Sequence, residues 1–242
     1  MKQLSYILLI TFAIITTVNA QDKTPAKQDT IRVDIWSDVV CPFCYMGKHR
    51  FEKALNAFDY KNNVMIVWHS YQLNPSAPKE YKGDMYDMMA EHFGKTRQWA
   101  MEHTKYMQHE AASVGLTYNY DIMKPANTFD AHRLIQLAAT HNLQDKAEEA
   151  LFRAYFTEGQ NIGDSATLIH IGTSIGLNEA EIKNMLQSNT FTDKVQADEK
   201  AADALNIPGV PYFIFNGKLK IDGAQPPQTF LKALEKAWRK SK

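Results

Sequence analysis

The sequence has little cysteine, no excess charge of either sign and no hydrophobic run long enough to span a membrane. Only two of its 242 residues are cysteine, which excludes a fold held together by several disulfide bonds. Lys and Arg number 27, as do Asp and Glu, so the formal net charge is zero. That balance argues against a nucleic-acid-binding protein, because such proteins usually carry a basic excess. The hydrophobic fraction of 45% is that of an ordinary globular chain rather than a disordered one.

The most apolar segment lies at the N-terminus, where residues 4–15 are almost all hydrophobic and follow Lys2. A membrane-spanning helix needs about 20 apolar residues, so this run is too short for an uncleaved anchor, the alternative interpretation. Small residues then stand three and one positions before a possible cut after Ala20, as signal peptidase requires. We therefore predict a signal peptide over 1–20, a flexible tether over 21–29, and a periplasmic or secreted mature protein without stable membrane insertion.

A strand, a helix and a second strand are predicted at the start of the mature chain. Apolar residues alternate with other residues over 31–35, and residues 64–71 are mostly β-branched or aromatic, so both segments favour strands. Between them, Pro42 fits the first position of a helix. This β-α-β unit places both cysteines, Cys41 and Cys44, at its first strand-to-helix turn.

The middle of the chain is predicted to be entirely helical. Apolar spacing, with Gly or Asn at most ends, predicts helices over 84–93, 96–114, 128–141, 143–158, 165–175 and 178–188. Strand signals return only near the C-terminus, where Asn216-Gly217 between apolar runs predicts a hairpin. The elements expected there are a helix over 190–205, strands over 211–215 and 218–221, and a last helix from Pro226 to Trp238.

This order of elements predicts one α/β domain that is interrupted by another. A sheet whose strands are separated by a helical block is typical of a domain carrying an insertion. We expect residues 30–75 and 190–242 to form the α/β domain and residues 76–189 to form an all-helical insertion.

The two cysteines form the motif C-P-F-C at residues 41–44. At the start of a helix, Cys41 would face unpaired backbone N–H groups and the positive end of the helix dipole, and both stabilise a thiolate. The thiolate is the nucleophile of thiol-disulfide exchange. We therefore expect Cys41 to attack a disulfide, and Cys44, one turn further into the helix, to resolve the mixed disulfide.

Two other interpretations of the cysteine pair remain open. A purely structural disulfide is possible, although so small a ring removes little chain entropy and would stabilise the fold weakly. A zinc site would need four ligands, and only His49 lies near the pair in the sequence, which has no second cysteine pair. The β-α-β context and the predicted export favour redox chemistry over both.

A second candidate segment, N-I-P-G-V-P-Y-F at residues 206–213, precedes the hairpin. In thioredoxin-like folds a cis-proline opens the strand beside the C-x-x-C motif. Pro211 is the candidate because it begins the predicted strand, whereas Pro208 is followed by the flexible Gly209; alternatively, both prolines merely end the preceding helix. Backbone groups of Val210 beside Cys41 would be free to pair with a substrate strand.

Five segments together identify a family resemblance: S-D-V-V-C-P-F-C-Y-M-G-K (37–48), N-T-F-D-A-H-R-L (127–134), A-Y-F-T-E-G (154–159), G-V-P-Y-F (209–213) and D-G-A-Q-P (222–226). The sequence resembles the DsbA-like thiol-disulfide oxidoreductases, and within them the FrnE-like branch, over nearly all of residues 31–236. The resemblance implies a thioredoxin-like fold with a helical insertion, and dithiol-disulfide chemistry on cysteine-containing proteins without a cofactor or metal. It matches Cys41 to the nucleophile, Cys44 to the resolving cysteine and Pro211 to the cis-proline.

The chain departs from the family in two respects. Some FrnE-like proteins have a second cysteine pair near the C-terminus, and this sequence has none, so a further electron transfer must involve another molecule, an unidentified redox partner. Between the cysteines stand Pro42 and Phe43, where DsbA itself has a histidine. Phenylalanine cannot donate a hydrogen bond or a positive charge to a thiolate, which predicts a less oxidising pair than that of DsbA.

Two alternative functions are also open. Glutathione-dependent isomerases and transferases share the fold, but they typically have serine at the position of Cys41. A peptide-binding chaperone is the second, because methionines and aromatic residues are concentrated in one stretch. Residues of these types lie more often in a protein core than on a binding surface, so core packing is the competing interpretation. The stretch contains Met85, Tyr86, Met88, Met89, Phe93, Trp99, Met101, Tyr106 and Met107.

Four polar residues are candidates for a supporting role. In thioredoxin-like folds a buried acid near the pair accepts the proton of the resolving cysteine, and either Asp34 or Asp38 could serve, although each could equally be a hydrogen-bonded aspartate of the strand. Asn127 and His132 belong to the N-T-F-D-A-H-R-L segment and could face the site from the insertion, although a histidine satisfied within a core is the commoner case.

Overall fold

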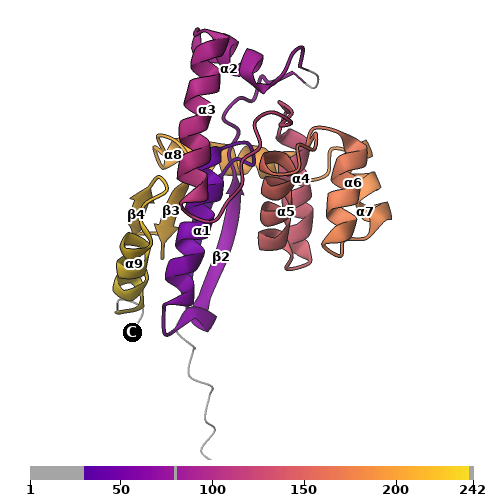
Figure 1. The fold of residues 1–242 in the computed structure, drawn as a ribbon. Coiled ribbons are helices and arrows are strands. Elements are labelled where there is room, and N and C mark those ends of the chain that lie inside the picture. Colours follow the sequence, from indigo (N-terminus) through magenta and orange to yellow (C-terminus); the bar gives the residue numbers. More distant parts are fainter. Residues whose placement is uncertain (1–29, 79–80, 240–242) are drawn as a thin grey trace, which may run out of the picture.

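A computed structural model of the chain describes residues 30–78 and 81–239 (Figure 1). The predicted signal peptide and tether, residues 1–29, lie outside these residues. Within the part of the chain that is described, no helix combines the length and the apolar character needed to cross a bilayer.

The sheet has four strands in the order β2-β1-β3-β4. The central strand β1, Ile31–Ser37, pairs in parallel with β2, Val64–Ser70, and antiparallel with β3, Tyr212–Phe215. The edge strand β4, Leu219–Asp222, returns from β3 through Asn216-Gly217, and both of these turn residues have positive φ, 49° and 67°. The predicted hairpin is confirmed, because Asn and Gly tolerate the left-handed backbone that such a turn requires.

Helices cover both faces of the sheet. On one face, α1 (Pro42–Asn56) and α9 (Pro227–Arg239) pack together, and Phe51 and Phe230 meet the strand residues Phe213 and Phe215. On the other face, α8 (Thr192–Ala204) packs against Trp36 and the β3 residues of opposite parity. Because side chains alternate along a strand, neighbouring residues of β1 enter two separate apolar clusters.

The helices expected between the two groups of strands are present, which confirms a thioredoxin-like α/β fold with a helical insertion. They are α2 (Met85–Phe93), α3 (Arg97–Ala112), α4 (Phe129–Thr140), α5 (Gln144–Phe156), α6 (Ser165–Ser174) and α7 (Glu179–Gln187). Side chains fix several of their ends: Asp84 caps α2 and Thr96 caps α3, and Gly94 closes α2 in the left-handed conformation.

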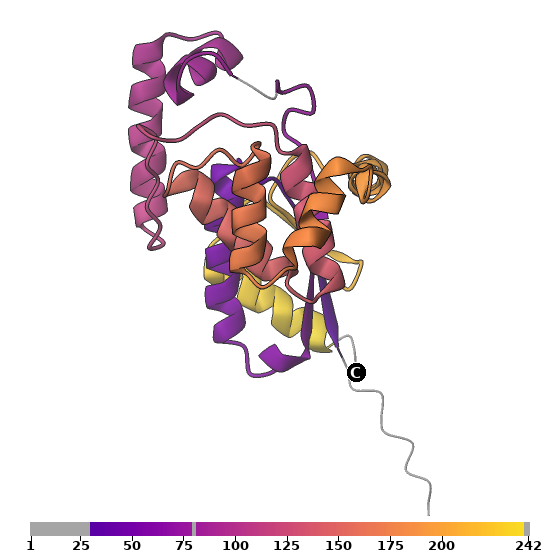
Figure 2. The same ribbon diagram turned by 90° about the vertical axis from the view of Figure 1, so that its right-hand side faces the viewer.

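The insertion approaches the sheet domain from two directions. Helices α2 and α3 stand above the N-terminal end of α1, while α4 to α7 lie beside the sheet (Figures 1 and 2). The N-terminal end of α1, where the cysteines lie, is therefore covered by the insertion.

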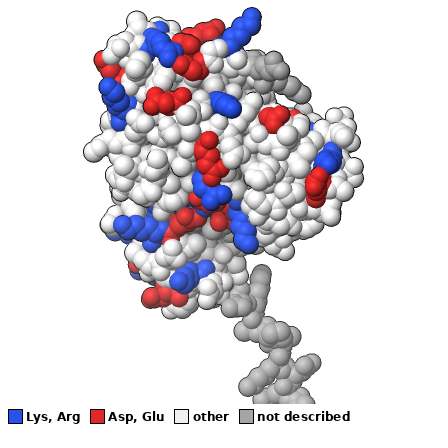
Figure 3. Space-filling view, turned by 45° about the vertical axis from the view of Figure 1, so that its right-hand side comes forward, with Lys and Arg blue, Asp and Glu red and all other residues white. Residues whose placement is uncertain are grey.

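The face drawn in Figure 3 carries basic and acidic side chains interspersed rather than a field of one sign, as the balanced composition predicts.

Candidate active site

Cys41 is the N-cap residue of α1. Its Sγ accepts a hydrogen bond from the backbone N–H of Cys44 at 3.3 Å, and its own N–H donates to the carbonyl of Asp38 at 3.0 Å. Pro42 occupies the first turn, where its missing N–H costs nothing. Both cysteines are free thiols and both are buried. The predicted position of Cys41 at a helix N-terminus is thus present, and the N–H of Cys44 in the first turn points at its sulfur.

Cys44 lies one turn further along α1 and is almost inaccessible to solvent. Burial raises the pKa of the Cys44 thiol well above its ordinary value, and the adjacent Cys41 raises it further. A thiol held in its neutral form is a poor first nucleophile, because the thiolate is the reactive species. The environment therefore favours Cys41 as the attacking sulfur.

The loop before β3 places a backbone carbonyl beside the sulfur. The thiol of Cys41 donates to the carbonyl oxygen of Val210 at 3.5 Å, and the Val210–Pro211 peptide bond is cis. This loop approaches α1 closely, since a Cβ added to Gly47 would lie 2.9 Å from Cγ of Pro211. Glycine at position 47 therefore allows the loop and the helix to come together.

The two residues between the cysteines have different environments. Phe43 is an exposed aromatic residue, whereas Pro42 is held by the insertion. The hydroxyl of Tyr118 donates to the carbonyl oxygen of Pro42 at 2.6 Å, and the Tyr118 ring stacks on Phe156 with centroids 4.3 Å apart. Sequence reasoning missed Tyr118. The only signal for it was a pair of tyrosines in the T-Y-N-Y segment, residues 117–120, between two helices.

Asp38 and His132 are brought together at the end of β1. The fully buried carboxylate of Asp38 accepts from the backbone N–H of Leu73 at 2.7 Å and lies 3.3 Å from Nε2 of His132. Burial alone would lower the pKa of His132, but its hydrogen bond to Asp38 and the charge of that carboxylate raise it overall. The two residues link the sheet domain to α4 directly beneath the active-site turn.

Asp34 does not lie with the cysteines. Val33 and Ile35 belong to the apolar cluster that includes α1, so Asp34, of opposite parity, faces the other side of the sheet. There its carboxylate pairs with Arg32 at 2.6 Å and with His69 at 2.8 Å. Burial would raise the pKa of Asp34, but these two partners lower it to about 2. The role considered for Asp34 as a proton acceptor for Cys44 is therefore wrong.

Asn127 has a local role in the structure. Its amide nitrogen donates to the carbonyl of Ala77 at 2.7 Å, and its amide oxygen accepts from the N–H of Phe129 at 3.0 Å. The first bond ties the start of α4 to the segment that follows β2, and the second is local to the start of the helix. Asn127 is absent from the walls of the cavity described below, although Ala126 and Thr128 beside it contribute to them.

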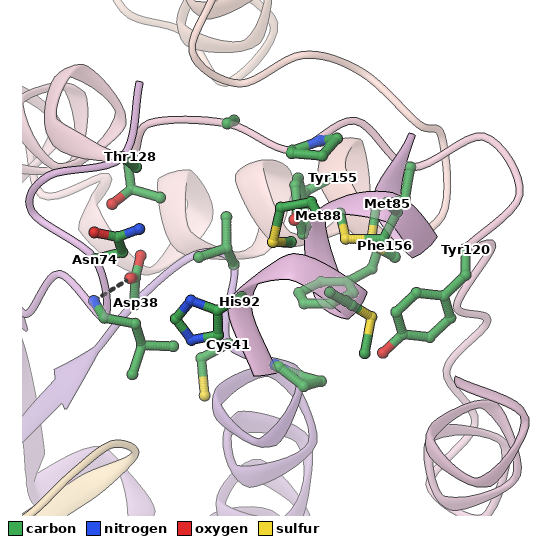
Figure 4. Close-up of a pocket in the computed structure, with 18 of the residues that line it drawn as sticks. Asp38, Cys41, Asn74, Met85, Met88, His92, Tyr120, Thr128, Tyr155 and Phe156 are labelled. Carbon is green, nitrogen blue, oxygen red and sulfur yellow. Dashed lines mark hydrogen bonds between the residues drawn. The ribbon is translucent and has the colours of Figure 1, made fainter. Parts of the chain in front are cut away.

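A cavity of about 340 Å³ opens directly over Cys41 (Figure 4). Cys41, Phe43 and Val210 form part of its wall on the side of the sheet domain. In Figure 4, Met85 and Met88 stand across the cavity from Cys41, on α2. Four of the methionines noted in the sequence line it, as Met85, Met88, Met89 and Met107, together with Met123.

No group of three or more His, Cys, Asp or Glu residues suited to a metal ion occurs within residues 30–78 and 81–239. His49, which a zinc site would have required, lies instead near Glu149, with 3.7 Å between its Nε2 and the carboxylate. Across the same interface, Lys48 is buried among acidic residues and pairs with Glu149 at 2.9 Å. These contacts join α1 to α5 and stabilise the helix that carries the cysteines.

Comparison with known proteins agrees with this geometry. Residues 32–235 match the DSBA-like thioredoxin domain family. The chain is 30% identical over 213 residues to YwbO of Bacillus subtilis (strain 168), an uncharacterized protein, and the match covers 87% of this chain and 99% of YwbO.

Solved structures show the same fold. The structure of a probable DsbA oxidoreductase, SCO1869 from Streptomyces coelicolor, has 34% sequence identity and a TM-score of 0.81, covering 86% of this chain and 90% of that one. Cytosolic disulfide reductase DsbM from Pseudomonas aeruginosa with GSH has 14% identity and a TM-score of 0.61, covering 86% and 99%. The chain therefore belongs to the DsbA-like thioredoxin domain family of disulfide oxidoreductases and isomerases.

Proposed function

We propose that this protein is an exported thiol-disulfide oxidoreductase of the oxidase or isomerase type, which exchanges disulfides with cysteine-containing proteins through Cys41 and Cys44. The observation that carries the proposal is the position of Cys41. Its sulfur lies at the N-terminus of α1 and 3.5 Å from the carbonyl oxygen of Val210. The helix terminus stabilises a thiolate, and the Val210 carbonyl beside it offers a hydrogen-bond acceptor to a substrate strand.

In the reducing direction, the Cys41 thiolate attacks one sulfur of a substrate disulfide and forms a mixed disulfide. The second substrate sulfur leaves as a thiolate and takes a proton. Cys44 then loses its proton and attacks Sγ of Cys41, which releases the first substrate sulfur as a thiol. The substrate disulfide has gained two electrons and two protons. The Cys41–Cys44 pair has lost two electrons as it closes a disulfide, and two protons, one when the Cys41 thiol ionises and one from Cys44. The oxidising direction is the reverse sequence.

The supporting roles follow from the same site. Pro42 and Phe43 shape the turn, Val210 and Pro211 form the wall against which a substrate segment lies, and Asp38 with His132 is the pair of ionisable groups beneath it. We propose the predicted boundaries for the two parts of the chain, with a thioredoxin-like domain over 30–75 and 190–242 and a helical insertion over 76–189.

A glutathione-dependent isomerase or transferase of the same fold is the second candidate. The structure of DsbM with GSH has this fold. Cys41 argues against this candidate, because glutathione-dependent isomerases and transferases of this fold are expected to have serine at its position. The cavity beside Cys41 also has no Lys or Arg among its described lining residues to pair with the carboxylates of glutathione. A peptide-binding chaperone would use the same apolar walls without using the cysteines.

Single-cysteine variants test the proposal. Cys41→Ser should abolish the reduction of insulin disulfides by the full chain, whereas Cys44→Ser should accumulate a mixed disulfide with the substrate that resists release. Unchanged insulin reduction by Cys41→Ser would overturn the proposal. Suppression of aggregation that survives in Cys41→Ser, without any exchange activity in the wild type, would favour the chaperone.

Thiol trapping in cells addresses the direction of the reaction and the export. A mostly oxidised pair would indicate an oxidase, and a mostly reduced pair would indicate an isomerase or reductase. In the same samples, an N-terminus at Gln21 is expected if residues 1–20 are removed, and retention of residues 1–20 would contradict export through a cleaved signal peptide.

A further inference from the structure

The cavity over Cys41 has walls of unusual composition. Five methionine side chains line it, four of them from α2 and α3 and one, Met123, from the segment that precedes α4. Methionine is flexible and polarisable, so it packs well against apolar groups of varied shape. The nearby Tyr155 and Phe156 are aromatic and come from α5. The insertion therefore supplies an adaptable apolar surface that faces the reactive sulfur.

The charges at the cavity are few. Among its described lining residues there is no Lys or Arg, and the one carboxylate, Asp38, already accepts the N–H of Leu73 and contacts His132. His92 and His103 are the remaining ionisable groups besides tyrosines and Cys41. An anionic ligand would thus find no fixed cation on these walls, whereas an apolar group would gain free energy by leaving water for them.

The mouth of the cavity is also apolar. Phe43, Leu73 and Phe93 line it, yet they are 46%, 50% and 53% exposed. Three large apolar side chains held in water around one opening mark a surface that another molecule covers. The volume of about 340 Å³ lies at the small end of ligand cavities, roughly 300–1,000 Å³, so it suits one or two side chains rather than a folded domain.

We infer that this cavity is a specificity subsite, which receives a large apolar side chain next to the reacting cysteine of an extended protein segment. The inference rests on the proposed function, because the mixed disulfide with Cys41 is what holds that neighbouring residue at the mouth. The carbonyl of Val210 aligns the segment, and the methionines of α2 and α3 provide the cavity wall against which the apolar side chain packs. Substrates are thereby selected for disulfides flanked by apolar residues, and glutathione disulfide is a poor partner.

The test uses the reduced full chain and two disulfide-linked peptide dimers that differ only in a Leu or a Ser beside the cysteine. Burial of one large apolar side chain corresponds to about a 10- to 100-fold preference, so the Leu dimer should react at least tenfold faster. Glutathione disulfide should react more slowly than the Leu dimer by a similar factor. Equal rates for the two dimers, or glutathione disulfide as the faster substrate, would overturn the inference.

Hydroxyethyl disulfide, which has no side chain to recognise, distinguishes failure of the apolar subsite from failure of the proposed dithiol chemistry. Reaction with it at Cys41 supports the dithiol chemistry even if the two peptide dimers react alike. Failure with every disulfide would overturn the proposed function itself.

Two methionine variants locate the subsite. Met88→Gln, in the cavity wall, should lower the Leu-to-Ser rate ratio several-fold, whereas Met101→Gln, an exposed methionine on α3 that does not line the cavity, should leave the ratio unchanged. Because the ratio is measured within each variant, a general loss of folded protein cancels. If the Leu-to-Ser rate ratio of Met88→Gln equals that of the wild type, the methionines do not form the subsite.

Discussion

The hydroxyl of Tyr118 donates a hydrogen bond of 2.6 Å to the carbonyl oxygen of Pro42, a residue between the two cysteines that lies 76 positions away in the sequence. The helical insertion therefore contacts the redox motif itself. Tyr118 is buried, and burial raises the pKa of its hydroxyl, as does charge on Cys41. The insertion thus fixes the active-site turn as well as covering it.

Replacement of Tyr118 by Phe should cost about 1 kcal/mol of unfolding free energy, because one buried hydrogen bond is lost while the ring keeps its stacking on Phe156. The carbonyl oxygen of Pro42 would also lose the hydrogen bond that neutralises part of its negative charge, so more negative charge would remain near the cysteine sulfurs. We therefore also expect Cys41 to react more slowly with iodoacetamide at neutral pH. Urea denaturation and alkylation rates measure both effects. Tyr106→Phe, an exposed position on α3, is the control and should change neither.

Glu148 and Glu149 are adjacent carboxylates whose pKa values shift in opposite directions. Burial raises the pKa of Glu148 to about 8, although His132 and Lys48 oppose the shift. Its pKa is raised above the unfolded value of about 4.3, so the unfolding free energy falls as pH rises from about 4.3 to 8. Glu148→Gln cannot titrate. Its stability relative to the wild type should therefore increase by a few kcal/mol, to order of magnitude, between about pH 5 and 8.

Glu149→Gln should show the reverse trend. Burial would raise the pKa of Glu149, but the nearby His49 and the ion pair with Lys48, together with the hydrogen bond from the hydroxyl of Tyr45, lower it to about 2. Its stabilisation is present above the unfolded pKa of about 4.3 and is lost as pH falls toward about 2. The variant should be less stable than wild type at neutral pH, with the gap closing in acid. Urea denaturation of both variants across pH measures this, and parallel trends would contradict the assignment.

Gly47→Ala should disturb the contact between α1 and the loop before β3. The added Cβ would lie 2.9 Å from Cγ of Pro211, and such overpacking costs about 1–3 kcal/mol, against a gain of about 1 from helix propensity. We expect a net loss of stability and slower disulfide exchange, since the Val210 carbonyl is displaced from Cys41. Gly209→Ala, which meets no atom within 4 Å, should keep its stability. A Gly47→Ala protein as stable and active as wild type would show that the loop moves freely.

His69 bridges two carboxylates on the α8 side of the sheet. Its Nε2 lies 2.8 Å from Asp34 and its Nδ1 lies 2.9 Å from Asp198, and its ring stacks on Trp36. Burial opposes the charged imidazole, but hydrogen bonds to Asp198 and Asp34 raise the pKa of His69 overall. His69→Gln should destabilise the fold by about 2–3 kcal/mol, because Asp34 and Asp198 both lose a charged hydrogen-bond donor, although Asp34 keeps Arg32 and Asp198 keeps Lys194.

The pH dependence of the unfolding free energy lost in His69→Gln distinguishes a charged bridge between Asp34 and Asp198 from simple packing of the His69 ring. The stabilisation from His69 is complete below its unfolded pKa of about 6.5 and is lost as pH rises through the raised folded value. That from Asp34 is present above about 3.9 and is lost as pH falls toward about 2. The gap between His69→Gln and wild type should therefore be widest between about pH 4 and 6.5. His170→Gln, an exposed histidine on α6, is the control, and a gap independent of pH would indicate packing alone.

The sequence by itself determined the secondary structure and the active-site motif. Alternating apolar residues indicated the strand over 31–35, and β-branched and aromatic residues indicated the strand over 64–71. Asn216-Gly217 fixed the hairpin, and capping residues such as Asp84 and Thr96 fixed helix ends. The N-cap position of Cys41 followed from the proline after it. All of these are local effects, decided by interactions within a few residues.

Only the tertiary structure decided how distant segments complete the site. Strand parity placed Asp34 on the α8 side and left Asp38, at the end of β1, to meet His132 of the insertion. The methionine-rich stretch was open to a core or a surface interpretation. Packing of α2 and α3 over Cys41 made it the wall of a cavity, with Met85 and Met89 buried and Met101 exposed. Such contacts depend on which faces of separate elements meet, and periodicity within one segment carries no information about the partner of its apolar face.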